Sequence, residues 1–314
     1  MAEVSVLRYW LLGVLLVLAV TAMPLRAAPA TGDDDPHVLV LGRISDSPKD
    51  HYAQLKPLLD YVVARMGDVG ITGGRILMAR DARQMSSYLR RGRVDWVTET
   101  AGTGMELQRR TGAQPLLLTE RGGASFYHTL IFARADSGLT SLADLRGRSI
   151  ALQGVGSTSS YIVPASMLLE AHLPLEILLS PRDRPDAQSV GYVFARSEFN
   201  IAAWVDKGMV EAGALNNLDW KDERRMPTAF RRNMRVLAQS PDFPRALEMV
   251  RPGMAPAVRE RLRQVLLQAS KDPQARDAMK RFFGTTRFLE LDGAALDALE
   301  HVRQAGARVR EQVE

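Results

Sequence analysis

Four consecutive hydroxyl-bearing residues, Ser157-Thr158-Ser159-Ser160, follow the segment Gly154-Val155-Gly156. They come after a predicted buried strand at 149–153 and begin a helix that ends near residue 172. Unpaired backbone N–H groups and the positive end of the dipole at a helix start favour an anion. The hydroxyls add donors suited to phosphate-like oxygens, and the glycines allow close backbone approach. The pattern predicts an oxyanion site; plain helix capping by Ser or Thr is the alternative.

Other chemistries find little support in the residue pattern. The segment is no Walker loop, because no Gly-Lys-Ser/Thr follows, and no dinucleotide fingerprint, because Ser159 stands where the third glycine belongs. The chain has no cysteine, which excludes disulfides, a lipobox anchor and thiolate metal sites. Its five histidines are dispersed without metal-ligand spacing. We therefore expect no metal, no cofactor and no catalytic residue, although an enzyme on a similar scaffold stays a minor alternative.

The charge distribution does not indicate a nucleic-acid partner. The 314 residues carry a formal net charge of +5, but the basic residues are scattered among acids and aromatic residues make up only 6%. Nucleic-acid binding would require a basic stripe with aromatic stacking platforms. Mild basicity is compatible with a small anionic ligand.

The elements that position the hydroxyl cluster alternate between strand and helix. Apolar runs predict strands at 38–44, 75–79, 94–98, 115–119, 127–133, 149–153, 190–194, 210–214, 234–238 and 246–250. Helical spacing predicts helices at 55–66, 82–91, 141–145 and 258–269, and the chain beyond residue 250 is expected to be helical. This alternation predicts an α/β fold with mostly parallel sheets flanked by helices, in one large domain or two lobes.

The N-terminus has the layout of a secretory signal. Arg8 precedes an apolar run from Trp10 to Val20, and Ala28-Pro29-Ala30 suits signal peptidase. We predict a signal peptide at 1–30, a linker at 31–36 and export to the periplasm. An uncleaved membrane anchor is the alternative.

Three segments together resemble a known family. They are Tyr127 to Gly138 (YHTLIFARADSG), Ser141 to Gly147 (SLADLRG) and Gly156 to Pro164 (GSTSSYIVP). They are similar to the phosphonate-binding (PhnD-like) substrate-binding proteins of ABC importers, whose hallmark is Ser-Thr-Ser-Gly-Tyr-x-x-Pro after Ser-Leu-x-Asp-Leu-x-Gly. The resemblance extends more loosely from about Val38 to Phe283.

The resemblance implies a two-lobed type II periplasmic-binding-protein fold that closes on a ligand. Lobe 1 is expected at 37–122 plus 236–290, lobe 2 at 123–235, and a C-terminal helix at 291–314. By matching position, Ser157, Thr158 and Ser159 would clasp a tetrahedral oxyanion. Tyr127 matches an aromatic ligand contact, and Glu211, where the family has Asp, would meet a cationic ligand group or cap a helix.

This sequence departs from the family pattern at three places. Ser160 replaces the motif glycine, Thr98-Glu99-Thr100 stands in the first-lobe loop, and Ser197-Glu198 replaces a His-Asp pair. Ser45, after the first strand, would contact ligand or cap a helix. The candidate ligand-binding residues are Ser157, Thr158, Ser159, Tyr127, Tyr161, Ser45, Glu99, Ser197 and Glu211.

The functional prediction is a periplasmic receptor for a small oxyanion-bearing ligand that delivers it to an ABC permease in the inner membrane. We expect it to act as a monomer, without nucleic acid. A sensory module that reports its bound state to a signalling partner is the alternative.

Overall fold

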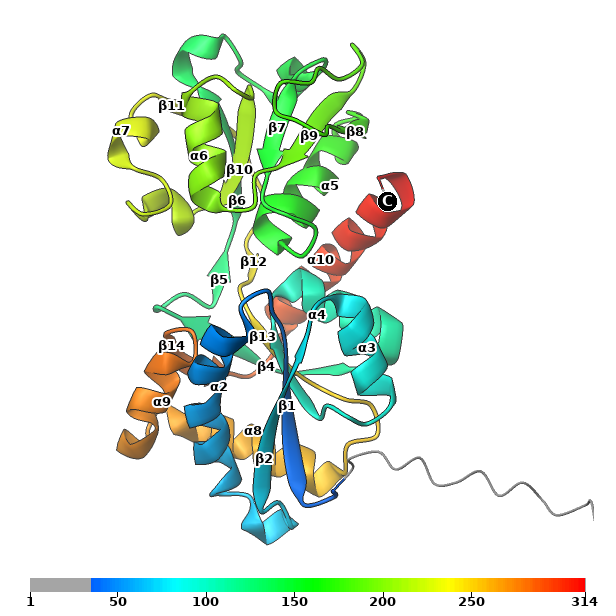
Figure 1. Cartoon of the computed structure of the whole chain (residues 1–314), viewed down its shortest axis with the longest axis vertical. Helices are drawn as coiled ribbons and strands as arrows, with labels where there is room; N and C mark the ends of the chain where they lie inside the picture. Colours follow the sequence, from blue (N-terminus) through cyan, green and yellow to red (C-terminus); the bar gives the residue numbers. More distant parts are fainter. Residues whose placement is uncertain (1–34, 314) are drawn as a thin grey trace, which may run out of the picture. The chain divides into compact units, whose positions relative to one another are not determined.

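The computed structural model of the chain describes residues 35–313 (Figure 1). The predicted signal peptide and most of the linker lie outside the described residues. Within residues 35–313, no helix has both the length and the apolar character needed to cross a membrane. Two six-stranded sheets organise this part of the chain.

The first sheet has the strand order β14-β4-β13-β3-β1-β2. Its strands are β1 (Val38–Ile44), β2 (Gly73–Ala79), β3 (Trp96–Glu99), β4 (Gln114–Arg121), β13 (Leu247–Val250) and β14 (Thr285–Leu289). β1 is parallel to β2 and β3, whereas β13 and β14 run antiparallel to their neighbours. Since β13 and β14 follow the whole second sheet in sequence, the chain leaves the first sheet and later returns to complete it.

The helices of the first lobe bury one apolar face each. They are α2 (Pro48–Val63), α3 (Ala82–Arg90), α4 (Ala101–Thr111), α8 (Pro256–Ala269) and α9 (Arg276–Arg281), with the short turns η1 (Gly67–Val69) and η6 (Pro273–Ala275). Leu55, Leu58, Leu59 and Val62 recur at helical spacing in α2 and are fully buried, as the sequence predicts. The helix expected at 82–91 ends at Arg90, and Gly92 follows at φ +70°.

The second sheet has the order β11-β6-β10-β7-β9-β8 and is parallel except for β6. Its strands are β6 (Thr129–Arg134), β7 (Ser149–Leu152), β8 (Leu175–Ile177), β9 (Val190–Phe194), β10 (Ala212–Asn216) and β11 (Met234–Gln239). Its helices and turns are η2 (Ala135–Ser137), η3 (Leu142–Leu145), η4 (Thr158–Ile162), α5 (Val163–Glu170), α6 (Glu198–Asp206), η5 (Asp219–Lys221) and α7 (Thr228–Arg231). The predicted α/β fold with mostly parallel, helix-flanked sheets is confirmed.

Two antiparallel strands connect the lobes. β5 (Phe126–Tyr127) pairs with β12 (Phe243–Pro244), and both run between the two sheets in Figure 1. The strand predicted at 127–133 is therefore divided at His128, whose N–H donates to the Asn217 side chain at 3.1 Å. The lobe boundary expected between residues 235 and 236 falls inside β11, which stays paired to β6 up to Gln239.

One prediction about the C-terminal third is wrong. Residues 285–289 were expected to be helical but form β14, paired with β4. Gly284, at φ +68°, turns the chain after α9, and Phe288 then packs into the first-lobe core. A five-residue strand with a register shift has too little alternation to be read from sequence alone.

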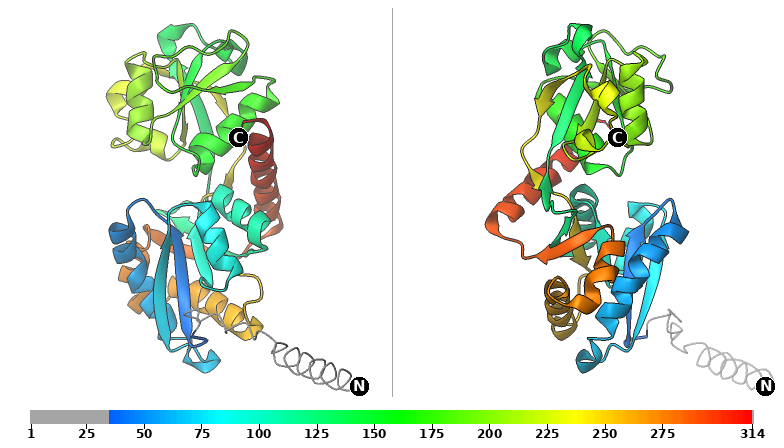
Figure 2. Two further views of the ribbon diagram at one scale, coloured as in Figure 1. Left: turned by 45° about the vertical axis from the view of Figure 1, so that its right-hand side comes forward. Right: turned by 90° about the vertical axis from the view of Figure 1, so that its left-hand side faces the viewer.

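Helix α10 (Gly293–Gln312) packs on both lobes (Figure 2). Ala295, Leu299 and Val302 join a core with residues of the first sheet, whereas Val309 joins the core of the second. Arg310 pairs with Glu106 of α4 at 2.9 Å, and Arg308 donates to Ser166 of α5 at 2.6 Å. The helix thus fastens the lobes to each other along one side.

Gly213 tests the packing of α6 on β10. A Cβ at this position would lie 2.6 Å from Ile201 Cγ2 and 2.9 Å from Phe132 Cζ, closer than real contacts allow. We expect Gly213→Ala to lower the free energy of unfolding by about 1–3 kcal/mol through overpacking. Urea denaturation measures this, with Gly293→Ala, where the added Cβ meets nothing within 4 Å, as control. Equal stability of the two variants would contradict the packing described.

Candidate anion-binding site between the lobes

A cavity of about 810 Å³ lies between the two lobes and is lined from both. The carboxyl ends of β1, β3 and β7 open onto it, as ligand sites in open α/β sheets do. Its volume falls in the range typical of small-molecule sites, roughly 300–1,000 Å³. Eight arginines and five acidic residues line it, so its lining carries an excess of positive charge.

The hydroxyl loop, Ser157 to Ser159, lines this cavity, but each hydroxyl also has a structural role. Ser157 Oγ accepts from the Ser160 N–H at 3.1 Å. Ser157 therefore caps the helical turn, as the alternative interpretation of the sequence expected. Ser159 Oγ accepts from the Asn216 amide at 3.4 Å. A hydroxyl that accepts one hydrogen bond still has its own proton to donate. The backbone N–H groups of Thr158 and Ser159 begin a helical turn and so have no acceptor within it.

Thr158 joins the two lobes directly. The Gly102 N–H, at the start of α4, donates to Thr158 Oγ1 at 2.9 Å. Thr103 Oγ1 donates to the Gly156 carbonyl at 3.4 Å. Thr158 thereby satisfies one of the N–H groups that the first turn of α4 leaves without an intrahelical acceptor. It is buried in this contact while still lining the cavity.

An arginine cluster from the first lobe, Arg43, Arg121 and Arg245, lines the same cavity. Arg121 ends β4, is 8% exposed, and donates from Nη2 to Thr98 Oγ1 at 3.1 Å. The Nε atoms of Arg43 and Arg121 are buried without a hydrogen-bond partner. Among residues 35–313, neither Arg121 nor Arg245 has a carboxylate within ion-pair distance. Burial, followed by the charge of Arg43, lowers the pKa of Arg121 to about 10, so it stays cationic at neutral pH.

The cluster is held by aromatic and polar neighbours. The guanidinium carbons of Arg43 and Arg121 lie 5.0 Å and 4.6 Å from the ring centre of Phe283. Arg245 donates to the Arg121 carbonyl. These contacts fix the guanidinium groups in place without neutralising them.

A buried carboxylate, Glu248 on β13, lies behind the cluster. It accepts hydrogen bonds from Trp96 Nε1 at 2.6 Å, Thr98 Oγ1 at 2.9 Å and Thr119 Oγ1 at 2.6 Å. Thr98 therefore links Glu248 to Arg121. Burial raises the pKa of Glu248 to about 7, although the three donors and the charge of Arg121 act in the opposite direction.

Two first-lobe residues expected from the sequence line the cavity in supporting roles. Glu99 accepts from the Ile44 N–H at 2.9 Å and pairs with Arg43 at 3.0 Å. The negative charge of Glu99 is thus paired with Arg43 within the first lobe. Ser45 Oγ accepts from the Ser47 N–H at 3.0 Å and lies 2.6 Å from His51 Nδ1.

Tyr127 lies where the two halves of the cavity meet. Its ring packs on Phe243 at 4.8 Å between centroids, and it lines the cavity from β5. Burial raises the pKa of Tyr127 to about 12, although the charges of Arg245 and Arg121 act in the opposite direction. The hydroxyl loop and the arginine cluster line the same cavity as Tyr127.

Three expected site residues do not line the cavity. Tyr161 is buried in the second-lobe core against Phe194, with 5.2 Å between ring centroids. Ser197 caps α6 by accepting from the Asn200 N–H at 3.2 Å, while its neighbour Glu198 lines the cavity. Glu211 precedes β10, at the edge of the sheet away from the cavity, and accepts from the Ser149 N–H and hydroxyl at 2.8 and 2.7 Å.

Sequence reasoning missed the arginine cluster, although one signal was present. Arg43 stands at the end of an apolar strand, where a buried charge requires a reason. Arg121 follows a predicted strand in the same way. A charged residue at the carboxyl end of a buried strand is a candidate for a ligand contact. Arg245 carries no such signal because it lies in the connection after β12.

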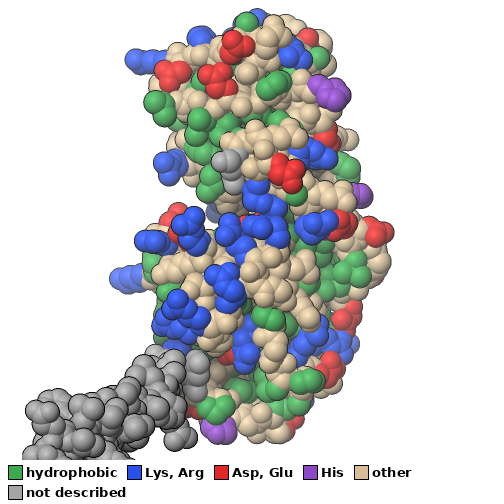
Figure 3. Space-filling model, turned by 90° about the vertical axis from the view of Figure 1, so that its right-hand side faces the viewer, with side chains coloured by type: hydrophobic (Ala, Val, Ile, Leu, Met, Phe, Trp, Pro, Cys, Tyr) green, Lys and Arg blue, Asp and Glu red, His purple; other side chains and the backbone are tan. Residues whose placement is uncertain are grey.

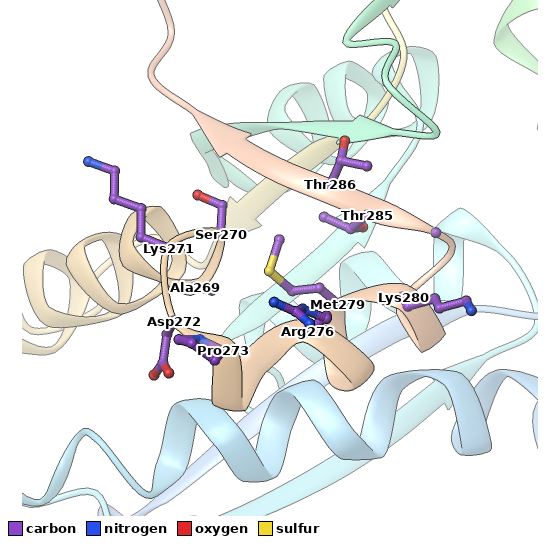
Figure 4. Close-up of a pocket in the computed structure, with 11 residues that line it drawn as sticks. Ala269, Ser270, Lys271, Asp272, Pro273, Arg276, Met279, Lys280, Thr285 and Thr286 are labelled. Carbon is purple, nitrogen blue, oxygen red and sulfur yellow. The ribbon is translucent and has the colours of Figure 1, made fainter.

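A smaller hollow of about 340 Å³ lies in the first lobe near α8, α9 and β14 (Figure 4). Lys271 and Lys280 extend to opposite sides of it, so their ammonium groups do not converge. The Asp272 carboxylate is engaged by Tyr61 and Arg65, each at 2.9 Å. No group of three metal-ligating side chains occurs within residues 35–313. The cavity between the lobes is thus the better candidate site.

Exposed basic side chains also belong to the lining of the cavity. The space-filling view shows Lys and Arg gathered on the face that α3, α4 and α10 form (Figure 3). Exposed arginines of these helices that also line the cavity are Arg83, Arg110 and Arg303. These charges raise the local concentration of anions.

Two sheets joined by crossover strands around a charged cavity define a periplasmic binding protein of type II. Residues 42–296 match the family of ABC transporter phosphonate periplasmic substrate-binding proteins, and the chain belongs to this family. Structures of XAC2383 from Xanthomonas citri, one bound to chloride ion and one to ATP, are similar to it. They show 55% and 54% identity, cover 88% of this chain and 100% of theirs, and give TM-scores of 0.84.

A more distant structure shares the fold. PhnD1 from Prochlorococcus marinus (MIT 9301), solved in complex with methylphosphonate, is 14% identical, with a TM-score of 0.64. The match covers 88% of this chain and 100% of that one.

The Gly102–Thr158 contact depends on the absence of a side chain. A Cβ on Gly102 would lie 2.7 Å from Ile162 Cδ1 and 2.8 Å from Thr158 Oγ1. We expect Gly102→Ala to hold α4 away from the hydroxyl loop and to increase the radius of gyration in small-angle X-ray scattering. Gly67→Ala, where a Cβ meets nothing within 4 Å, is the control. Superimposable scattering of Gly102→Ala and the parent would refute the role given to this contact.

Glu248 predicts a pH dependence of stability. Its pKa in the folded chain is about 7, above the unfolded value of 4.5, so the folded state retains a proton that the unfolded state releases. The free energy of unfolding should therefore decrease as pH rises from about 4.5 to about 7. We expect the parent to lose about 2–3 kcal/mol more than Glu248→Gln over this window in urea titrations. Parallel pH profiles of the two proteins would contradict this.

Proposed function

We propose that this chain is a periplasmic receptor that binds a small phosphate-bearing anion between its lobes and delivers it to an ABC permease. The observation that carries the proposal is the single cavity lined by the hydroxyl loop and the arginine cluster. Hydroxyl and backbone N–H donors bind tetrahedral oxyanions, and guanidinium groups bind them through bidentate hydrogen bonds.

Membership of a substrate-binding family supports the transport role. The ATP bound to XAC2383 carries phosphate groups of the kind that these donors recognise. We propose that the chain binds this class of anion, catalyses no reaction on it, acts as a monomer, and is exported by residues 1–30 as a signal peptide.

Ligand capture would be coupled to the approach of the lobes. Thr158 contacts α4, while its neighbours Ser157 and Ser159 line the cavity. An anion held by the hydroxyl loop and the arginine cluster touches both lobes only when they are close together. Its binding would therefore favour the closed arrangement, in which water is excluded and each charged hydrogen bond is strengthened.

Ser159→Ala tests the hydroxyl loop. Removal of one donor to a charged ligand oxygen should cost about 1.5–3 kcal/mol, which is roughly a ten- to 150-fold increase in Kd. Isothermal titration calorimetry with methylphosphonate, orthophosphate and ATP measures this effect. Ser160→Ala is the matched control, because Ser160 is buried beside the loop but does not line the cavity.

Two results would contradict the proposal. The first is the absence of binding by any of the three anions to the parent protein. The second is an equal loss of affinity in Ser159→Ala and Ser160→Ala, since an effect on packing alone would not distinguish a cavity-lining hydroxyl from its buried neighbour.

A further inference from the structure

The arginine cluster and the hydroxyl loop face one cavity from different lobes. Arg43 and Arg121 reach it from the ends of β1 and β4, and Arg245 reaches it from the connection after β12. The hydroxyl loop reaches it after β7. A lone tetrahedral anion clasped by the hydroxyl loop would fill only a small part of the 810 Å³.

We propose that the arginine cluster is a second anion subsite, so that the ligand carries at least two linked phosphoryl groups, one for each lobe. This inference rests on the proposed function, because it assigns a second contact to the same ligand. The chemical class is that of diphosphates and longer phosphoanhydrides.

The first support is charge that the protein leaves uncompensated. Arg121 is 8% exposed, its Nε has no hydrogen-bond partner, and no carboxylate of residues 35–313 lies within ion-pair distance of it. Burial of a guanidinium costs free energy unless it is paired. Glu248 makes no direct ion pair with Arg121: Thr98 bridges the two by hydrogen bonds, and the Glu248 charge acts on Arg121 from behind this bridge. An anion at this place would supply the missing partner.

The second support is the way the cluster is oriented. Glu99 holds Arg43 at 3.0 Å, and Arg43 Nη1 also donates to the Thr98 carbonyl at 2.7 Å. Arg121 donates to Thr98 Oγ1 from β4, across the intervening strand β13. Both guanidinium groups are thus anchored before any ligand arrives, as a preorganised binding site requires.

The third support is the adjacency of the two subsites. Tyr127, Ser159, Arg121 and Arg245 all line the one cavity. Arg245 directly follows β12, whose Phe243 pairs with Tyr127 in the connection between the lobes. Because the two subsites adjoin this connection within one cavity, one compact ligand would be able to touch both.

The test compares inorganic pyrophosphate with methylphosphonate on the full chain by isothermal titration calorimetry. The parent should bind pyrophosphate about tenfold more tightly or better. Arg121→Gln should weaken pyrophosphate binding about tenfold or more, since a charged hydrogen bond is lost, and methylphosphonate binding by less than about threefold. Ser159→Ala should weaken the binding of both.

Arg245→Gln provides an independent variant if the buried Arg121→Gln fails to fold, and the same selective loss is expected. Arg91→Gln is the control: it removes the same charge from an exposed position directly after α3 that does not line the cavity. It should change the two affinities equally and little.

The outcomes separate the two claims. Suppose that methylphosphonate binds and that Ser159→Ala weakens its binding, but that Arg121→Gln and Arg245→Gln leave the pyrophosphate affinity unchanged. The second subsite is then overturned while the proposed function stands. If Arg121→Gln and Arg245→Gln reduce both affinities equally, the cluster acts through general charge and the inference is again overturned. If pyrophosphate and methylphosphonate do not bind the parent, and orthophosphate and ATP do not bind either, both claims fail.

Discussion

The cavity contains a guanidinium charge that is buried without a carboxylate in ion-pair contact among residues 35–313. Arg121 ends a core strand, stacks on Phe283 and contacts Thr98, yet no carboxylate of the described residues neutralises it directly. Such a group is stable only because aromatic and hydroxyl neighbours share the cost of its burial. The free-energy cost of burying this guanidinium is consistent with a binding site, where a charged group is positioned for a ligand.

The second lobe supplies a different kind of donor. Its hydroxyl loop accepts hydrogen bonds within the second lobe, and Thr158 also accepts one from the Gly102 N–H at the start of α4. The same loop is therefore part of the ligand cavity and part of the contact between lobes. Helix α10 and the β5–β12 pair hold the lobes together at other points, so that a small anion needs to bias only the local approach around Gly102.

Much of the fold could be predicted from the sequence, because parallel strands buried on both faces leave long apolar runs such as Val38 to Ile44. The strand β14 was missed because five residues with one bulge give no clear period.

For the candidate site, Ser157 to Ser159 and Tyr127 were found from their motif, and the structure brings them to one cavity. Arg245 was not found, since it lies in a connecting segment and reaches the cavity only through the return of the chain to the first sheet. Tyr161 was expected at the cavity because it shares the motif, but the helical turn η4 places it on the core side.

Anomalous diffraction from crystals grown with tungstate, a heavy tetrahedral oxyanion, tests the central claim most directly. We predict one peak within hydrogen-bonding distance of Ser159 and a second beside the guanidinium groups of Arg121 and Arg245. Peaks confined to the exposed arginines of α3 and α10, or to the hollow near Lys271, with none between the lobes, would contradict the account.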